Sequence, residues 1–418
     1  MSDEIPSTAP STDLTQPNGN FIFANQDMYE VQKYAIYGST ILPATDSNFK
    51  TTFGITDDEW TEDPSSIMHN LQRTYANIST HCGDFQNNTM NNIAGVAGIV
   101  TNHGDMVQGF YKEIIASAQK LAAMDVIPPE GSTDPVLTPE ERKEQKLGLT
   151  REILGFVKAQ ILLVEPEAAK VAECVKEITE FRTKTQTDGG EVSEQKPKVT
   201  ARFGDEKKIL ADFKKDSETL TVEINKAQRE YDNYCIVAEV TPIMSGSQPQ
   251  VTHLSINSTK YISVLVPIFG WIAGPIMAGI YGDKAVKALK SRNELQKKLS
   301  EKMAAKKKSL HFVSVYELID TQVGDLDTRI TKVLRCLEII QGAWDKLKTD
   351  LEAIKNLLED DLKPAAARAW STKLELEMKL WADVAERARS YQRVAFISTP
   401  TVEEYMANPS KFESTTNQ

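Results

Sequence analysis

Apolar residues recur at alternating spacings of three and four along most of this chain, a pattern typical of long helices that pack against one another. The clearest run has ten consecutive apolar positions, which are Leu326, Ile330, Val333, Leu337, Ile340, Trp344, Leu347, Leu351, Ile354 and Leu358. No stretch keeps the strict alternation of apolar and polar residues that a half-buried strand requires. We therefore expect an all-α fold, an elongated bundle of long coiled-coil helices.

A second helix is predicted from about Ser65 to Met124. Three polar residues, Thr89, Asn92 and His103, take places in its seam. The apolar members of the seam are Leu71, Tyr75, Ile78, Cys82, Phe85, Val96, Ile99, Met106 and Phe110. The polar places suggest that the middle of the helix packs loosely or meets a polar face of a partner helix. The alternative, which we favour, is that ordinary bundle positions here tolerate an occasional polar residue.

A third helix is predicted to begin at Thr138, whose hydroxyl can cap the first turn while Glu141 completes a capping box. Gly189–Gly190 and Pro197 predict a turn at its end. Its apolar stripe consists of Leu154, Val157, Ile161, Val164, Val171, Val175 and Ile178.

Three more helices follow from the same spacing, at about Thr200–Glu239, at about 284–320, and after Pro364, which should break the chain's helical course. The stripe of the last helix consists of Trp370, Leu374, Trp381, Val384, Ala388 and Tyr391.

One segment does not fit a soluble bundle. Residues Tyr261–Gly282 read YISVLVPIFGWIAGPIMAGIYG and contain no charge. This length meets the roughly 20 residues that a helix needs to span a bilayer. Tyr261 and Tyr281 lie near its ends, where interfacial aromatic residues are expected.

Two observations favour an apolar hairpin tip, at about 241–283, over a single membrane span. Helix-breaking residues interrupt the run, and we expect Pro267, Gly270, Gly274 and Pro275 to act as hinges. The flanking helices have similar lengths and matching stripes, so they can pair as antiparallel arms on one side of a membrane. The predicted membrane-contacting residues are Val264, Leu265, Ile268, Phe269, Trp271, Ile272, Ile276, Met277 and Ile280.

A basic run follows the apolar segment. Between Lys284 and Lys308 there are ten basic residues and two acidic ones. Lys284 and Lys287, with the two tyrosines, are predicted to lie at the interface with anionic lipid. The alternative is a solvated helix face paired with acidic neighbours, which we favour for Lys306–Lys308.

Composition excludes several other functions. The 418 residues carry a net charge of −11, which argues against nucleic-acid binding. The four cysteines and five histidines form no CxxC or HxxxH pair, and P-loop, GxSxG and HExxH motifs are absent. We therefore expect neither an enzyme nor a metal or other cofactor. Residues 1–20 are rich in Pro, Ser, Thr and Asn and lack a Sec signal pattern, so they predict a flexible tail.

Long helical arms around the tip VLVPIFGWIAGPIMAGIYG resemble the α-helical pore-forming toxins of the cytolysin A type. Within them, the chain is most similar to the A component of the binary Xax/Yax cytotoxins, from about Phe21 to the C-terminal helix. The resemblance implies a rod with a tail bundle and an apolar head. It also implies export without a Sec signal, a soluble form that attaches to the target host-cell membrane, and homo- or hetero-oligomers with a B component that build a lytic, haemolytic pore.

The resulting division of the chain is a tail at 1–20, tail bundle and long N-terminal helices at 21–200, hairpin arms and tip at 201–320, and long C-terminal helices at 321–418. Two other classes of protein stay open. One is a bitopic membrane-anchored coiled-coil scaffold, in which the apolar segment spans the membrane once. The other is a soluble coiled-coil adaptor, in which that segment is a buried core helix.

Overall fold

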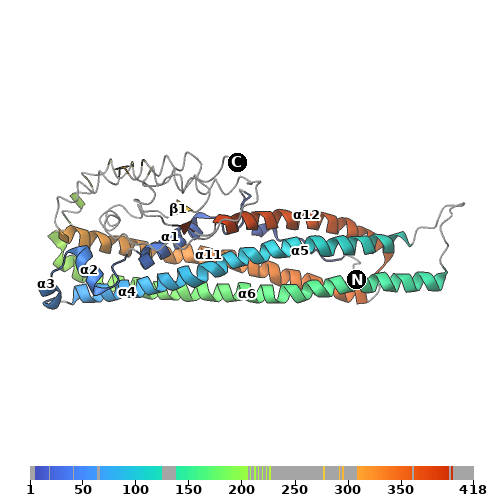
Figure 1. Cartoon of the computed structure of the whole chain (residues 1–418), viewed down its shortest axis with the longest axis horizontal. Helices are drawn as coiled ribbons and strands as arrows, with labels where there is room; N and C mark the ends of the chain where they lie inside the picture. The colour runs from blue at the N-terminus through green and yellow to red at the C-terminus, as the bar shows by residue number, and fades with distance from the viewer. Residues whose placement is uncertain are drawn as a thin grey trace. The chain divides into compact units, whose positions relative to one another are not determined.

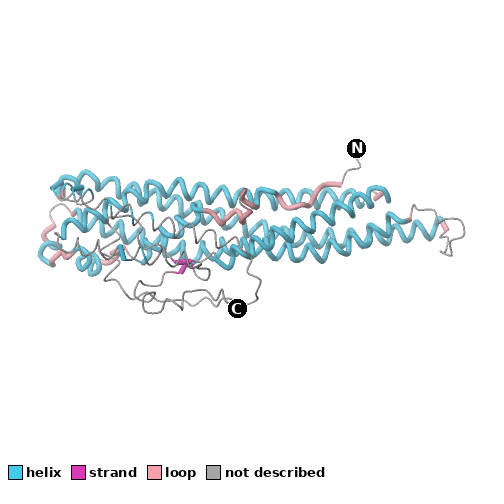
Figure 2. Tube along the Cα trace, turned by 90° about the horizontal axis from the view of Figure 1, so that it is seen from above, coloured by secondary structure: helices cyan, strands magenta, loops and turns pink. Residues whose placement is uncertain are grey.

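The computed structural model describes residues 5–17, 19–40, 42–63, 66–124, 138–205, 308–359, 362–394 and 397–398, with single positions between 208 and 295. Helices dominate these residues (Figure 2), which confirms the all-α prediction. The helical elements are η1 (Thr12–Leu14), α1 (Gln26–Thr40), α2 (Asp46–Phe53), α3 (Asp57–Thr61), α4 (Ile67–Asp84), the π-helix η2 (Phe85–Thr89), α5 (Met90–Ala123), α6 (Pro139–Arg202), α11 (Lys308–Glu359) and α12 (Pro364–Val394). Two short strands, β1 (Ile276–Met277) and β2 (Ile397–Ser398), pair antiparallel.

The chain divides into two compact units. The first comprises Met1–Ile22, Ala94–Lys176 and Arg335–Ser390. The second comprises Phe23–Ile93, Glu177–Leu334 and Tyr391–Gln418. Each unit therefore draws on several of the long helices.

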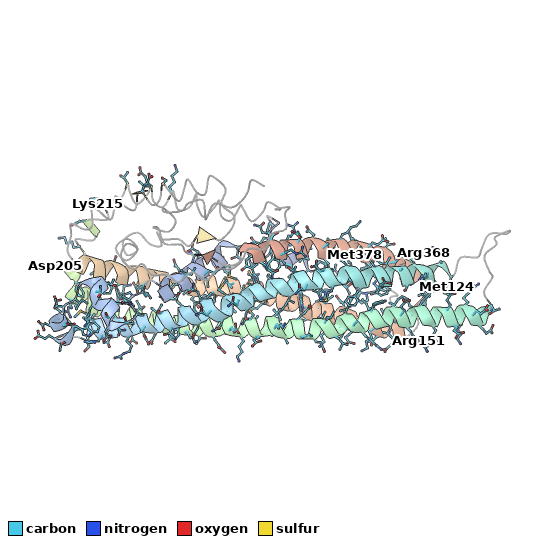
Figure 3. The ribbon with its side chains drawn as sticks, in the orientation of Figure 1. Met124, Arg151, Asp205, Lys215, Arg368 and Met378 are labelled. Atoms are coloured by element: carbon cyan, nitrogen blue, oxygen red, sulfur yellow. The ribbon has the colours of Figure 1, made fainter. Side chains whose placement is uncertain are left out.

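In the first unit, α5, α6, α11 and α12 form a bundle in which neighbouring helices run antiparallel (Figure 1). Its two largest fully buried side chains, Trp344 of α11 and Trp381 of α12, meet edge to face with ring centroids 6.0 Å apart. Pairs that define the helix directions are Ser117–Glu152 and His103–Glu167 between α5 and α6, Lys158–Glu359 and Lys348–Glu165 between α6 and α11, and Gln108–Met378 and Ala122–Arg368 between α5 and α12. Figure 3 labels Met124, Arg151, Arg368 and Met378 on these helices.

In the second unit, α4 packs antiparallel to the later part of α6, and α1 lies against α4. Side-chain contacts at Thr74–Glu191, Asn77–Glu191, His81–Asp188 and Phe85–Phe181 define the α4–α6 direction. The short helices α2 and α3 add an aromatic cluster, in which the Phe49 ring lies 5.6 Å from Trp60 and 5.9 Å from Tyr75. Asp63 links this end to α6, since Arg202 Nη1 lies 2.6 Å from its Oδ1.

The predicted seam of α11 is confirmed throughout, because each of its ten residues is at most 5 % exposed. The predicted break is also confirmed, since α11 ends at Glu359 and α12 begins at Pro364. All six residues of the predicted α12 stripe are buried.

The predicted seam from Ser65 to Met124 is right up to Thr89, and Val96 and His103 beyond it are also buried. At the remaining predicted positions the buried residue is one place later in the chain. Met106, a predicted seam residue, is 36 % exposed, whereas Val107 is 1 % exposed. Ile99 and Phe110 are half-buried, whereas their successors Val100 and Tyr111 are buried. The slip occurs across the π-helix η2, whose wider turn accommodates one extra residue and rotates the following helix relative to a regular repeat.

The start of α6 is as predicted. Thr138 Oγ1 accepts a hydrogen bond from Glu141 N at 3.2 Å, and the Glu141 carboxylate accepts one from Thr138 N at 2.9 Å. The backbone hydrogen bond from Thr138 is the main reason that the pKa of Glu141 lies below its ordinary value. The predicted turn at Gly189–Gly190 is wrong, because α6 continues through both glycines and Pro197 to Arg202.

The prediction of a flexible N-terminal tail is wrong for residues 5–16. Ile5, Thr8 and Leu14 are at most 7 % exposed, and the segment packs on α5 and α12 of the first unit. The composition of this segment predicted disorder because it is rich in hydroxyl residues. In the structure, the hydroxyls of Ser7 and Thr8 make hydrogen bonds to buried partners.

Candidate functional site

The predicted membrane-contacting, interfacial and hinge residues lie between Tyr261 and Lys287. All of them fall outside the described residues, except for the backbone of Ile276 and Met277. That backbone forms β1, in which Ile276 is opposite Ser398 and Met277 is opposite Ile397. The structure thus brings one point of the apolar segment to residues that follow α12, within the second unit.

The helices that lead into and out of residues 203–307 are described, and they lie next to one another. The stem, defined here as residues 182–202 of α6 and 308–327 of α11, is antiparallel (Figure 1). Arg182 pairs with Asp327, and ten residues further along α6 Val192 O accepts a hydrogen bond from Tyr316 Oη at 2.8 Å. The chain therefore leaves α6 and re-enters α11 at the same end of the second unit. Asp205 and Lys215, labelled in Figure 3, are helical positions beyond Arg202.

Polar pairs join the two sides of the stem. Arg182 Nε and Nη2 donate to the two carboxylate oxygens of Asp327 at 2.6 and 3.2 Å, and Gln186 donates to the same group at 2.8 Å. These hydrogen bonds, chiefly the one from Arg182, lower the pKa of Asp327. Lys196 Nζ lies 2.5 Å from Asp320, and this hydrogen bond raises the pKa of Lys196. Because the side chains are partly exposed, the pairs align the helices more than they stabilise them.

Close backbone packing requires Gly189 at the middle of the stem. A Cβ atom at this position would lie 2.7 Å from Cγ1 of Val323 on α11. The glycine therefore serves helix–helix contact in place of the predicted turn, which explains why a helix tolerates it here.

A buried acid–histidine pair lies one residue from that glycine. Asp188 Oδ2 lies 2.9 Å from Nδ1 of His81 on α4, and the Asp188 side chain is 1 % exposed. Burial raises the pKa of Asp188, against the opposing effect of His81. Burial, together with the Asp188 charge, also raises the pKa of the Cys82 thiol, so Cys82 is not an activated nucleophile. The arrangement fits a polar link between helices rather than a catalytic centre.

A second buried histidine lies in the first unit. His103 is 2 % exposed and packs beside Trp344 and Trp381, with ring centroids 5.5 and 4.7 Å away. Its Nδ1 lies 3.0 Å from Oε2 of Glu167, which also accepts a hydrogen bond from Trp344 Nε1 at 3.2 Å. Sequence reasoning identified His103 only as a polar seam residue and missed Glu167. The signal available was the seam position itself, since a polar residue there needs a partner on a facing helix.

Among the described residues, no helix has the length and hydropathy that a membrane crossing requires. The same part of the chain contains no cluster of His, Cys, Asp and Glu suited to a metal ion.

No family model matches the sequence, and no curated protein matches it either. Solved structures do match it. The HblL1 toxin component of Bacillus cereus has a TM-score of 0.58 at 10% identity, covering 96% of this chain and 100% of its own. Soluble SmhA of the tripartite α-pore-forming toxin of Serratia marcescens has a TM-score of 0.56 at 10% identity, covering 95% and 98%.

YaxA from Yersinia enterocolitica matches less well, with a TM-score of 0.38 at 13% identity over 91% of this chain and 98% of that one. The likeness to the binary A component therefore stays a prediction. What the two better matches establish is architecture, and the chain shares the all-α fold of these two toxin components.

Proposed function

We propose that the chain is a subunit of a multi-component α-pore-forming cytotoxin that attaches to target-cell membranes through the apolar segment Tyr261–Gly282. The observation that carries the proposal is the antiparallel stem. Residues 203–307 depart from α6 and return to α11 at one end of the second unit, so any membrane contact between them is made by an excursion whose two ends stay on one side.

This topology weighs against the bitopic scaffold. A chain that crosses a membrane once must leave its flanking helices on opposite sides. The contacts Arg182–Asp327 and Val192–Tyr316 instead join the flanks. The excursion can insert as a hairpin tip or dock on the surface, both of which suit a toxin component that is soluble before it meets lipid.

Assembly with other components is the second part of the proposal. The SmhA match is named as part of a tripartite toxin, and HblL1 as a toxin component. By analogy, this chain joins a partner component of the B type, forms homo- or hetero-oligomers with it, and leaves most of the membrane crossing to that partner. The proline- and glycine-interrupted apolar run supports docking better than lining a channel.

The test is flotation of the purified chain with liposomes, with dye leakage read from the same vesicles. Phe269→Asp/Ile272→Asp should abolish flotation, since two charges in the apolar segment oppose burial in lipid. A matched control places the same charges on exposed leucines of α6, as Leu147→Asp/Leu162→Asp, at positions 48% and 70% exposed. The control should float like the wild type.

Flotation without leakage, and leakage on addition of a partner component, would identify an attachment subunit. Strong leakage by the chain alone would identify a self-sufficient pore former. A wild-type protein that stays with the aqueous fraction at every lipid composition tested would overturn direct attachment and favour the soluble adaptor.

A further inference from the structure

The N-terminal residues Ile5–Gln16, called the strap here, pack against α5 and α12 of the first unit, and the surface that they cover is called the groove. Thr8 is 2 % exposed although it belongs to no helix or strand. Its backbone oxygen accepts a hydrogen bond from Trp381 Nε1 at 2.8 Å, and Tyr111 Oη donates to its Oγ1 at 2.6 Å. At the start of the strap, Lys373 Nζ donates to Ile5 O at 2.9 Å. The groove thus holds both the backbone and the side chains of the strap.

A buried carboxylate defines which sequence the groove accepts. Glu377 of α12 is 2 % exposed, and its Oε1 accepts a hydrogen bond from Ser7 Oγ at 2.6 Å. Its Oε2 accepts from Thr8 N at 3.2 Å and Thr8 Oγ1 at 2.6 Å. Among the described residues, hydrogen bonds to this carboxylate come from the strap alone. Tyr111 donates to the Thr8 hydroxyl, and the hydroxyls of Ser7 and Thr8 donate to Glu377. The groove therefore selects a segment with two adjacent hydroxyl residues.

A single turn connects the strap to the rest of the chain. Gln16 N donates to Asn20 O at 2.8 Å and Gly19 N to Gln16 O at 2.8 Å. Gly19 has φ +85°, the left-handed region that favours glycine, and a Cβ there would lie 2.6 Å from Nη1 of Arg387. This turn is the hinge at which the strap departs from the rest of the first unit.

Without the strap, the buried Glu377 carboxylate would lose its hydrogen-bond donors. Removing the partners of such a buried group is costly, so binding a segment that supplies the donors of Ser7 and Thr8 is favoured over leaving the carboxylate unpaired. A second copy of the chain carries the same segment, and an exchanged strap would keep every contact that the strap makes in its own groove. Exchange of an identical element between copies is a low-cost route to oligomers.

We propose that the α5–α12 groove is an exchangeable peptide site for an extended segment with adjacent hydroxyl residues, and that the strap of a second copy is its ligand in the oligomer. Within one chain the strap closes the groove, and between chains it links neighbours. The inference does not depend on the membrane contact proposed above, because exchange is measured in solution.

The experiment is complementation between two full-length variants. One has a disabled strap and an intact groove, Ser7→Ala/Thr8→Val. The other has an intact strap and a disabled groove, Tyr111→Phe/Glu377→Leu. Neither can form the contact within its own chain. When they are mixed, the intact strap of the second fits only the vacant groove of the first.

We expect each variant alone to be monomeric in size-exclusion chromatography with light scattering. The mixture should contain at least tenfold more dimer than either pool. Native mass spectrometry with one pool ¹⁵N-labelled distinguishes heterodimers from homodimers, and the new dimers should be mixed. As a matched control, Asp13→Ala changes an exposed strap residue. Mixing it with the groove variant should yield no extra dimer, because its own strap fills its groove.

Circular dichroism verifies that both pools retain wild-type helicity. If Glu377→Leu prevents folding, the isosteric pair Tyr111→Phe/Glu377→Gln replaces it. A mixture of two folded pools that contains no more dimer than the separate pools would overturn the proposal and restrict the strap to its own chain.

Discussion

The seam of α11 and the seam that runs through α4 and α5 have the same heptad signature but different outcomes. From Leu326 to Leu358 every predicted position is buried, without a slip. From Leu71 the predicted positions are buried as far as Thr89. Beyond it Val96 and His103 are still buried, but at the other predicted positions, Asn92, Ile99, Met106 and Phe110, the buried residue is the next one along the chain. The two seams cover similar lengths of helix, so the gradual drift of an α-helix against a heptad repeat does not explain the difference.

What separates them is one wide turn. The π-helix η2 interrupts the α4–α5 course, whereas α11 is a regular helix from Lys308 to Glu359. The comparison teaches that a heptad pattern predicts the buried face only while every turn holds the same number of residues. One extra residue is enough to exchange a buried position for an exposed one.

The largest difference between the two seams is expected in how they respond to the deletion of a single residue. Glu338 in α11 and Asn88 in η2 are both exposed. Deleting Glu338 rotates everything after it by about 100°, the angle per residue of a helix with 3.6 residues per turn. We expect this variant to lose cooperative thermal unfolding. Deleting Asn88 should let the π-turn become an α-turn, and the variant should keep wild-type helicity and a melting transition.

Circular dichroism on both deletions, with thermal melts, checks the prediction. Equal loss of structure in the two variants would show that the extra residue of η2 is needed for packing and that the register argument is incomplete.

The next largest effect is expected at the centre of the uninterrupted seam. Trp344 is fully buried, stacks edge to face on Trp381, and donates to Glu167. Trp344→Ala should lower the free energy of unfolding by about 3–5 kcal/mol through the cavity and the lost contacts. Urea titration followed by circular dichroism measures this change. A loss below about 1 kcal/mol would mean that the bundle collapses around the cavity.

A smaller effect tests the slipped seam directly, with neighbouring residues as mutual controls. Val107→Ala should cost about 1.5–3 kcal/mol, since Val107 is 1 % exposed. Met106→Ala should stay within about 0.5 kcal/mol, since Met106 is 36 % exposed although the heptad places it in the seam. The reverse order in urea titrations would restore the regular seam and contradict the slip.

The same contrast explains how much of the fold the sequence could predict. Periodicity located the long helices, the Thr138 cap and the Pro364 break because each depends on residues close in sequence. Periodicity failed at η2, at Gly189 and in the strap, where the local structure depends on contacts with residues far away in the sequence. Gly189 looks like a turn residue until Val323 is known to approach it, and Thr8 looks disordered until Glu377 is placed beside it.

The candidate site also has features that the sequence predicts and features that only the fold shows. Composition alone identifies the apolar segment, because a run of uncharged residues is visible without partners. The predicted pairing of the arms at about 200–239 and 284–320 falls mostly outside the described residues. What the structure shows is that the helices on either side of residues 203–307, α6 and α11, contact each other at Val192–Tyr316. The links Asp188–His81 and Glu167–His103 join residues far apart in sequence. The seam position of His103 indicates that it needs a polar partner, but the sequence alone does not identify which residue that partner is.

The smallest effect on stability is expected at the stem, where polar pairs between α6 and α11 align two helices that already pack together. Arg182 lowers the pKa of Asp327, so the pair's contribution to stability is present above the ordinary carboxyl pKa of about 3.9 and is lost as the pH falls through the lowered value. Asp327→Asn should cost about 0.2–1 kcal/mol at pH 7, as exposed pairs do, and less at high salt. In urea titrations the gap between wild type and variant should close as the pH falls below the lowered pKa of Asp327. Asp325→Asn, which removes a neighbouring exposed carboxylate, controls for the change in net charge. A gap that is unchanged at low pH would assign the effect to packing of the side chain, and the stem would then be held as the α11 seam is, by its apolar contacts.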